Sequence, residues 1–175
     1  MESYLNSIRH QFEYYKQIGE KSIEQLEDKD IFFQADPESN SIATIVTHLA
    51  GNMLSRFTDF FTTDGEKSWR DRDSEFNPKF TQSKEVMDYW EKGWNCFLSV
   101  IHSLQPEDLE KTILIRGEQY TVIGAVNRQL AHYPYHIGQI IYIAKSIKKE
   151  EWQTLSIPKN KSGEYNFIVF SRHKK

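Results

Sequence analysis

Apolar residues recur at intervals of three and four positions in four separate stretches of the chain. This spacing places apolar side chains along one face of a helix. The stretches predict helices over residues 3–27, 42–61, 86–104 and 121–147, with Thr121 as an N-cap of the last. Each apolar face must be buried against another element, and the shared rhythm favours antiparallel neighbours. The sequence therefore predicts an all-α fold, an antiparallel four-helix bundle.

The connections between these helices differ in character. Residues 63–82 are polar and contain Gly and Pro, which predicts a long loop between the second and third helices. We expect three aromatic residues of this loop to anchor it, namely Trp69, Phe76 and Phe80. Residues 112–121 carry β-branched side chains on both sides of a Gly, which predicts a short β-like excursion before the fourth helix.

The length and composition indicate one domain. A chain of 175 residues normally forms a single compact unit, and we expect residues 1–175 to do so, with the bundle core at about 1–148. Aromatic residues make up 14% of the chain, which predicts an aromatic-rich core. Residues 148–175 carry seven Lys/Arg against three Asp/Glu, so we expect residues 149–175 to form a solvated basic tail.

The composition also argues against several partners. The formal net charge of −3 provides no basic field for phosphate backbones, so we expect no nucleic acid partner. Cys96 is the only cysteine, which excludes an intramolecular disulfide and favours a reducing compartment. No stretch has membrane-spanning length, and no secretory leader opens the sequence, so we expect a cytoplasmic protein without a membrane partner.

Three histidines form the candidate site. His132 and His136 are four residues apart on the fourth predicted helix, and one helical turn brings such side chains over the same patch. With six histidines in the chain, this pair alone is a weak motif. His48 adds weight, because it falls within the apolar face of the second helix and should point inward. Facing helices of a bundle can build a metal site from such side chains.

Three neutral imidazoles suit a divalent ion, with Zn or Ni favoured and Fe, Mn or Cu also compatible. They leave a coordination position open for water or substrate, which points to chemistry. Ligating imidazoles need partners that fix their tautomers, and we expect Asn52, one turn beyond His48, and Gln139, three residues beyond His136, to supply them.

Structural alternatives stand beside this hypothesis. One or more of the three imidazoles can be a core histidine that is hydrogen-bonded to protein groups, with no ion nearby. Pro134, between the two histidines of the fourth helix, should free a backbone carbonyl and either kink that helix or end it. Cys96 can be a nucleophile, although a buried free cysteine usually behaves as a small apolar residue. We expect His10, His102 and His173 to be solvated surface residues.

The segments 47–49 and 132–139, with the sequences Thr-His-Leu and His-Tyr-Pro-Tyr-His-Ile-Gly-Gln, resemble motifs of the DinB/YfiT-like metal-binding four-helix bundles. The resemblance covers about residues 1–148 and implies that His48, His132 and His136 bind a divalent ion in a protein that often forms homodimers. Ile137 stands where such relatives frequently carry Arg, so recognition of an anion is not carried over.

Characterised members of that superfamily include S-transferases that use low-molecular-weight thiols. The resemblance therefore implies a metal-dependent enzyme with small-molecule substrates. It would transfer a low-molecular-weight thiol to an electrophile, or it would be a metal-dependent hydrolase. The alternative is a noncatalytic metal-stabilised homodimer that serves as a binding or scaffold protein. The sequence identifies no catalytic acid or base.

Overall fold

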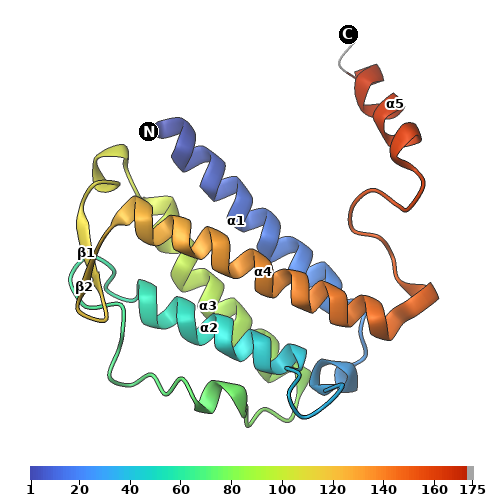
Figure 1. Ribbon diagram of the computed structural model, residues 1–175, viewed down its shortest axis with the longest axis horizontal. Helices are drawn as coiled ribbons and strands as arrows, with labels where there is room; N and C mark the ends of the chain where they lie inside the picture. The colour runs from blue at the N-terminus through green and yellow to red at the C-terminus, as the bar shows by residue number, and fades with distance from the viewer. Residues whose placement is uncertain (173–175) are drawn as a thin grey trace.

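The computed structural model describes residues 1–172 and confirms the mostly helical bundle. Four long helices make up its body: α1 (Glu2–Ile23), α2 (Ile42–Phe57), α3 (Ser83–Ser103) and α4 (Val122–Lys148). A fifth helix, α5 (Ser162–Arg172), lies in the tail. Figure 1 shows the four long helices side by side, while α5 stands apart at the end of an extended segment.

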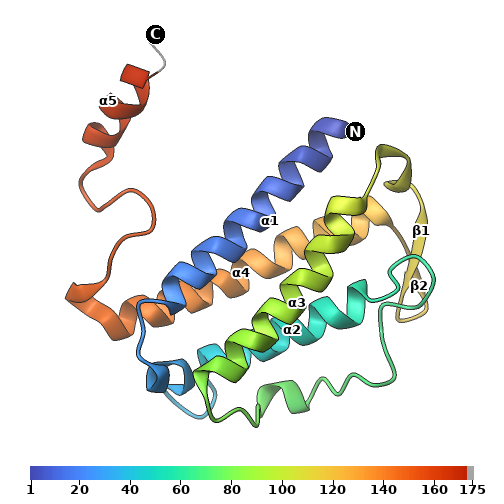
Figure 2. The same ribbon diagram turned by 180° about the vertical axis from the view of Figure 1, so that it is seen from behind.

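Short elements connect the helices. Strands β1 (Thr112–Ile115) and β2 (Glu118–Thr121) form the expected antiparallel hairpin, in which Thr112 pairs with Thr121. Single 3₁₀ turns occur at Asp28–Phe32, Ser74–Phe76, Pro106–Asp108 and Lys149–Glu151. The hairpin lies at one end of the bundle and the tail leaves from the other, as both views show (Figures 1 and 2).

Local capping explains where the helices begin. The side chain of Ser41 accepts a hydrogen bond from the backbone N–H of Thr44 at the start of α2, and Thr121 accepts one from Gly124 at the start of α4. These contacts satisfy backbone donors that the first turn of a helix leaves free. The predicted cap of the fourth helix is confirmed.

The core is aromatic, as expected. Phe12 of α1 contacts Phe97 of α3 edge to face, with ring centroids 4.6 Å apart. Tyr133 of α4 packs against both of these rings and against Trp94 of α3. Such contacts between aromatic rings add to the free energy of burial. One aromatic layer therefore joins three of the four helices.

The first two helices are shorter than predicted. The first helix ends at Ile23 rather than at residue 27, and the second ends at Phe57 rather than at residue 61. Pro134 does not end the fourth helix, since α4 continues through it to Lys148. A long helix that packs along its whole length against its neighbours tolerates the loss of one backbone hydrogen bond.

The aromatic residues of the long loop and the tail differ in how they pack. Phe80 is partly buried against the core, and Phe76 contacts His48 of α2 although its side chain is 42% exposed, so both anchor the loop, whereas Trp69 is 58% exposed. The tail contains α5, and none of the residues of this helix is buried. Residues 173–175 of the tail, including His173, lie outside the described residues. His10 and His102 are exposed, as expected.

No helix among residues 1–172 combines the length and apolar character required to cross a bilayer.

Candidate metal centre

Helix α2 carries His48 into the interior of the bundle. Fourteen of its sixteen residues are buried. Helix α2 packs on α3 and also contacts α4 and the long loop that follows α2. His48 is itself only 6% exposed. A buried imidazole on such a helix needs a polar partner or an ion, because burial without one costs free energy.

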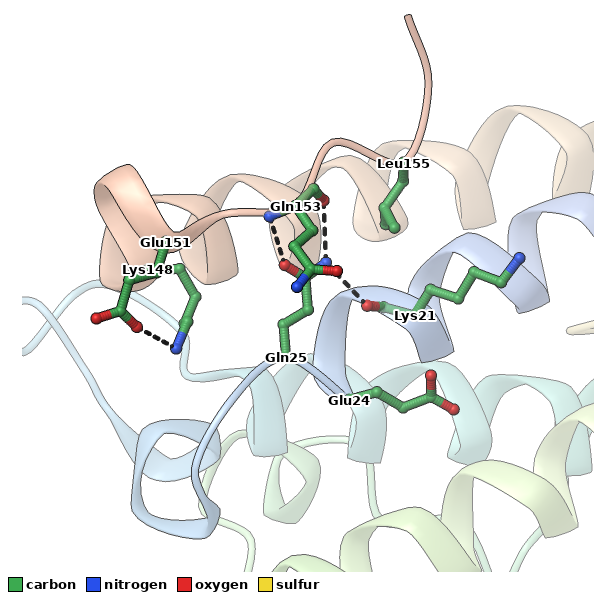
Figure 3. Close-up of a pocket in the computed structure, with 7 residues that line it drawn as sticks. All are labelled: Lys21, Glu24, Gln25, Lys148, Glu151, Gln153 and Leu155. Carbon is green, nitrogen blue, oxygen red and sulfur yellow. Dashed lines mark hydrogen bonds and ion pairs between the residues drawn. The ribbon is translucent and has the colours of Figure 1, made fainter. Parts of the chain in front are cut away.

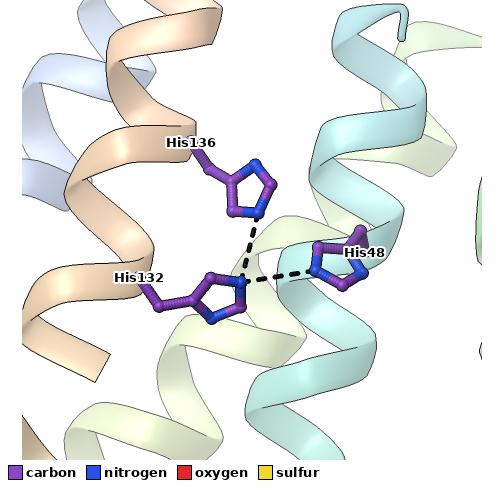
Figure 4. A group of neighbouring side chains, drawn as sticks. All are labelled: His48, His132 and His136. Atoms are coloured by element: carbon purple, nitrogen blue, oxygen red, sulfur yellow. Dashed lines mark hydrogen bonds between the residues drawn. The ribbon is translucent and has the colours of Figure 1, made fainter. Parts of the chain in front are cut away.

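Helix α4 supplies the other two histidines. His132 and His136 point from successive turns toward His48, as Figure 4 shows. His136 is 6% exposed, whereas His132 is half-buried and borders a hollow at the surface. Of the three imidazoles, that of His132 therefore has the most contact with solvent.

The three rings present the same nitrogen to one point. Nε2 of His132 lies 3.4 Å from Nε2 of His48 and 3.1 Å from Nε2 of His136 (Figure 4). Nitrogens bound about 2.1 Å from one ion at tetrahedral or octahedral angles lie about 3.0–3.4 Å apart. The ligand atoms of the three residues all lie within 4.8 Å of one another. This geometry fits a single divalent ion.

The other ring nitrogens fix the tautomers. Nδ1 of His48 lies 2.9 Å from Oε2 of Glu75, and Nδ1 of His136 lies 2.8 Å from Oε1 of Gln139. Both oxygens are acceptors, so both Nδ1 atoms donate, and in neutral rings Nε2 carries a lone pair. Only His132 can hold a proton at Nε2. At least two bare lone pairs therefore converge, an arrangement that a cation stabilises.

The rings of His132 and His136 are held in the neutral form. Burial, followed by the neighbouring His136 and His48, lowers the pKa of His132 to about 3. Burial also lowers the pKa of His136 to about 4, against the opposing hydrogen bond of Gln139. Both imidazoles are therefore neutral near pH 7, which is the form that binds a metal.

Glu75 is the residue that sequence reasoning missed. It comes from the 3₁₀ turn Ser74–Phe76 in the long loop and is 5% exposed. Arg70 donates two hydrogen bonds to its carboxylate, at 2.7 and 3.0 Å. Burial raises the pKa of Glu75, but the hydrogen bonds from His48 and Arg70 outweigh burial and lower it. The carboxylate is therefore ionised and holds the ring of His48 in place.

Gly51 makes room for this carboxylate. It lies on α2, three residues after His48, and a Cβ atom added there would come within 2.3 Å of Oε1 of Glu75. Arg70 already bonds to Oε1 of this carboxylate, and His48 bonds to Oε2. Any side chain at this position would therefore displace the carboxylate that orients the histidine.

The two predicted supporting residues differ in outcome. Gln139 lies against His136, as described above. The side chain of Asn52 bonds to another residue than His48, because its Oδ1 accepts a hydrogen bond of 3.1 Å from the hydroxyl of Tyr133. Tyr133 is fully buried, and Asn52 satisfies its hydroxyl group. Cys96, the other candidate, is partly buried on α3 and lies beside Thr58 rather than the histidines.

Aromatic rings cover two of the imidazoles. Phe76 stacks on His48, with the ring centroids 5.5 Å apart. The ring centroid of Tyr135 lies 4.0 Å from that of His136. Both aromatic side chains are about half exposed. They shield the faces of the imidazoles from water while leaving the Nε2 atoms free.

A hollow of about 340 Å³ opens beside His132 and His48. Five arginines line it: Arg56, Arg70, Arg72, Arg116 and Arg128. We call it the arginine hollow. A second hollow, of about 580 Å³, lies where the tail leaves the bundle (Figure 3). Charges of both signs line it, from Lys21, Glu24, Lys148 and Glu151.

The chain belongs to the DUF1572 family, described as proteins of unknown function, whose model matches residues 1–161. The matched part contains the four long helices and every residue of the histidine site, and it ends one residue before α5 begins. A comparison with curated proteins gives no match. The function therefore has to be argued from the site itself.

Proposed function

We propose that the protein is a metal-dependent enzyme of the DinB/YfiT-like type, in which His48, His132 and His136 bind one divalent ion through Nε2. The observation that carries this proposal is the convergence of the three Nε2 atoms while Glu75 and Gln139 occupy Nδ1 of two rings. Imidazole nitrogens favour Zn or Ni, and Fe, Mn and Cu remain compatible ions.

The surroundings of the site favour catalysis over a purely structural role. Three ligands leave part of the coordination sphere open, and His132 borders the arginine hollow, from which a small molecule can approach. A bound divalent ion supplies a Lewis acid that lowers the pKa of a coordinated water or thiol and so provides a nucleophile. Glu75 keeps the proton of His48 at Nδ1, and Phe76 and Tyr135 keep water from the ring faces.

The reaction we propose first is transfer of a low-molecular-weight thiol to an electrophile, with metal-dependent hydrolysis as the variant. The support is the resemblance of the segments 47–49 and 132–139 to motifs of a superfamily whose characterised members include thiol-dependent S-transferases, together with the open face of the site. We also propose that the protein acts as a homodimer, which sedimentation analysis of the purified chain tests.

Elemental analysis and metal titration test the ion. We expect about one Zn or Ni per chain in wild-type protein purified without a tag, and loss of that ion in His132→Ala. His102→Ala is the matched control, because His102 is exposed on α3 and lies 2.9 Å from Glu13, away from the site. Equal metal content in wild-type protein and in the two variants would overturn the site.

Turnover assays separate the two roles of the ion. Metal-loaded protein is incubated with panels of low-molecular-weight thiols and electrophiles and with hydrolysable esters and amides, beside His132→Ala. Turnover that His132→Ala abolishes supports the enzyme. If the loaded protein shows no turnover while the ion raises its unfolding temperature, the noncatalytic metal-stabilised alternative is correct.

A further inference from the structure

The arginine hollow carries more positive charge than its carboxylates balance. Five guanidinium groups line it, and no Asp or Glu is among its described lining residues. Glu66 pairs with Arg56 at 3.1 Å and with Arg116 at 2.8 Å. Glu75 pairs with Arg70 at 2.7 Å. Two carboxylates therefore pair with three of the five arginines, in a chain whose formal net charge is −3.

The arginines come from separate parts of the chain, and the fold holds them together. Arg70 and Arg72 belong to the long loop, Arg116 to the hairpin turn and Arg128 to α4. Asp64 joins the loop to the hairpin, because its carboxylate accepts hydrogen bonds from the backbone N–H groups of Arg116 and Gly117 at 2.8 and 2.7 Å.

The backbone of the turn is suited to this contact. Arg116 has a φ of 57° and Gly117 a φ of 76°, both in the left-handed region. That conformation is unfavourable for arginine and is common in two-residue hairpin turns. In this conformation the two backbone N–H groups point at Asp64, and their hydrogen bonds help offset its free-energy cost. The conformation of the turn therefore holds Arg116 beside the hollow.

Three of the arginines keep most of their donors free. Arg116 uses Nε for Glu66, which leaves both terminal nitrogens available. Arg128 lies over the ring of Tyr120 at 5.9 Å and makes one long contact of 3.4 Å to its hydroxyl. Within residues 1–172 the guanidinium of Arg72 has no hydrogen-bond partner and no ion pair. Guanidinium groups with open donors bind carboxylate and phosphate oxygens in pairs.

We infer that the arginine hollow binds the oxyanion group, a carboxylate or a phosphate, of a small-molecule substrate whose reactive part faces the three histidines. The volume of about 340 Å³ suits a small metabolite. Arg128 lies one turn before His132 on α4, so the anion and the reactive atoms would lie on neighbouring turns of one helix. The placement of the reactive part rests on the proposed function, whereas the binding of the anion does not.

This site does not depend on the arginine that relatives frequently carry in place of Ile137. Ile137 is fully buried and faces the core near Gly19 of α1, where a guanidinium would be desolvated. The positive charges come instead from the end of α2, the loop, the hairpin turn and the first half of α4. Anion recognition is therefore a property of this chain's own arrangement.

An NMR titration tests the inference in metal-free protein. Inorganic phosphate and succinate are added at constant ionic strength while the Nε–H signals of the arginines are followed, with sodium chloride as the reference salt. We expect the signals of Arg72, Arg116 and Arg128 to shift with saturation, and the signal of Arg9 to stay in place. Arg9 is bonded to backbone carbonyls of α3 and the residue after it, so it is an internal control.

Two double variants complete the design. Arg72→Gln/Arg128→Gln should weaken the binding of the probes by roughly tenfold or more, since charge-assisted hydrogen bonds are lost. Lys21→Gln/Lys148→Gln removes the same charge from the hollow of Figure 3 and should leave probe binding unchanged. Saturable binding of either probe that only the arginine variant weakens supports the inference and identifies the oxyanion. Shifts no larger than those with chloride, or equal weakening by both variants, would overturn it.

The result is independent of the test for the ion. If the probes bind while elemental analysis finds no metal, the proposed metal chemistry falls and the anion site stands. If the ion is present while neither probe binds, the anion site falls and the metal centre stands.

Discussion

Two hollows at the surface of the same bundle hold their charges in different ways. In the hollow of Figure 3, Lys148 pairs with Glu151 three residues away, and the side chain of Glu151 is 78% exposed. Beside the histidines, Glu75 and Arg70 pair with side-chain exposures of 6% and 3%, and Glu75 also contacts His48, 27 residues earlier in the chain.

The comparison shows that volume alone does not distinguish the proposed site. The hollow at the tail is the larger of the two, yet its opposite charges neutralise one another in solvent. The described charged residues that line the arginine hollow are all arginines. Buried polar groups from distant segments, His48, Arg70 and Glu75, contact one another beside it. Burying such groups costs free energy unless each is paired, so their assembly indicates a role beyond folding.

The largest effect should come from removing the buried carboxylate. In Glu75→Gln, Arg70 stays buried without its counter-charge, and the free energy of unfolding should fall by about 3 kcal/mol. The affinity for the ion should fall by about 10- to 100-fold, because the ring of His48 loses its orienting partner. Urea denaturation and metal titration measure the two quantities.

The matched change in the other hollow is Glu151→Gln. It removes an exposed partner of Lys148 and should change the free energy of unfolding by less than about 0.5 kcal/mol. Similar losses of unfolding free energy in Glu75→Gln and Glu151→Gln would show that burial does not distinguish the two ion pairs.

A smaller effect should follow from a methyl group on α2. Gly51→Ala places a Cβ against Oε1 of Glu75, so the carboxylate must move away from His48 and Arg70. We expect weaker metal binding than in wild-type protein and a net loss of about 1–2 kcal/mol in the free energy of unfolding. In Gly138→Ala no atom lies within 4 Å of the new Cβ, and the variant should gain up to about 1 kcal/mol. A stabilised Gly51→Ala with unchanged metal binding would contradict the packing described.

The sequence predicted those parts of the site that depend on helical periodicity. The spacing of His132 and His136 determines that both lie on one face of α4, and the apolar pattern around His48 places it inside. These inferences need only the repeat of the helix and the rule that its apolar face is buried. The four long helices and the hairpin followed from the same kind of reasoning.

The parts that were missed depend on loops and on side-chain direction. Glu75 is one of five acidic residues in the loop 63–82, and no periodicity distinguishes it from the others. Its usable signal was the adjacent Phe76, whose ring stacks on His48. Asn52 was placed near His48 by its spacing alone, but on a helix buried on nearly all sides, spacing does not decide which neighbour a side chain contacts.

The amide partners of the two regions allow a finer test. Gln139→Ala removes the acceptor for Nδ1 of His136, so the ring can adopt the other tautomer, and metal affinity should fall by about tenfold. Gln25→Ala removes two hydrogen bonds to Gln153 at the hollow of Figure 3 and should leave metal affinity unchanged. Calorimetric titration with Zn measures both variants. An equal affinity in Gln139→Ala and Gln25→Ala would show that Gln139 does not orient the ring.

The smallest effect should come from deleting residues 162–175, which removes α5 and the residues after it. The described residues of α5 include none that is buried, and Phe167 and Phe170 are 75% and 63% exposed. A helix that contributes no buried apolar area should contribute little to the free energy of unfolding, so we expect a change below about 0.5 kcal/mol. Metal content and probe binding should also match the full chain, because the histidines and the arginine hollow lie entirely within residues 1–161. Urea denaturation at two protein concentrations provides the check. A concentration-dependent loss of stability on deletion would show instead that the exposed aromatic residues of α5 are covered by a second copy of the chain.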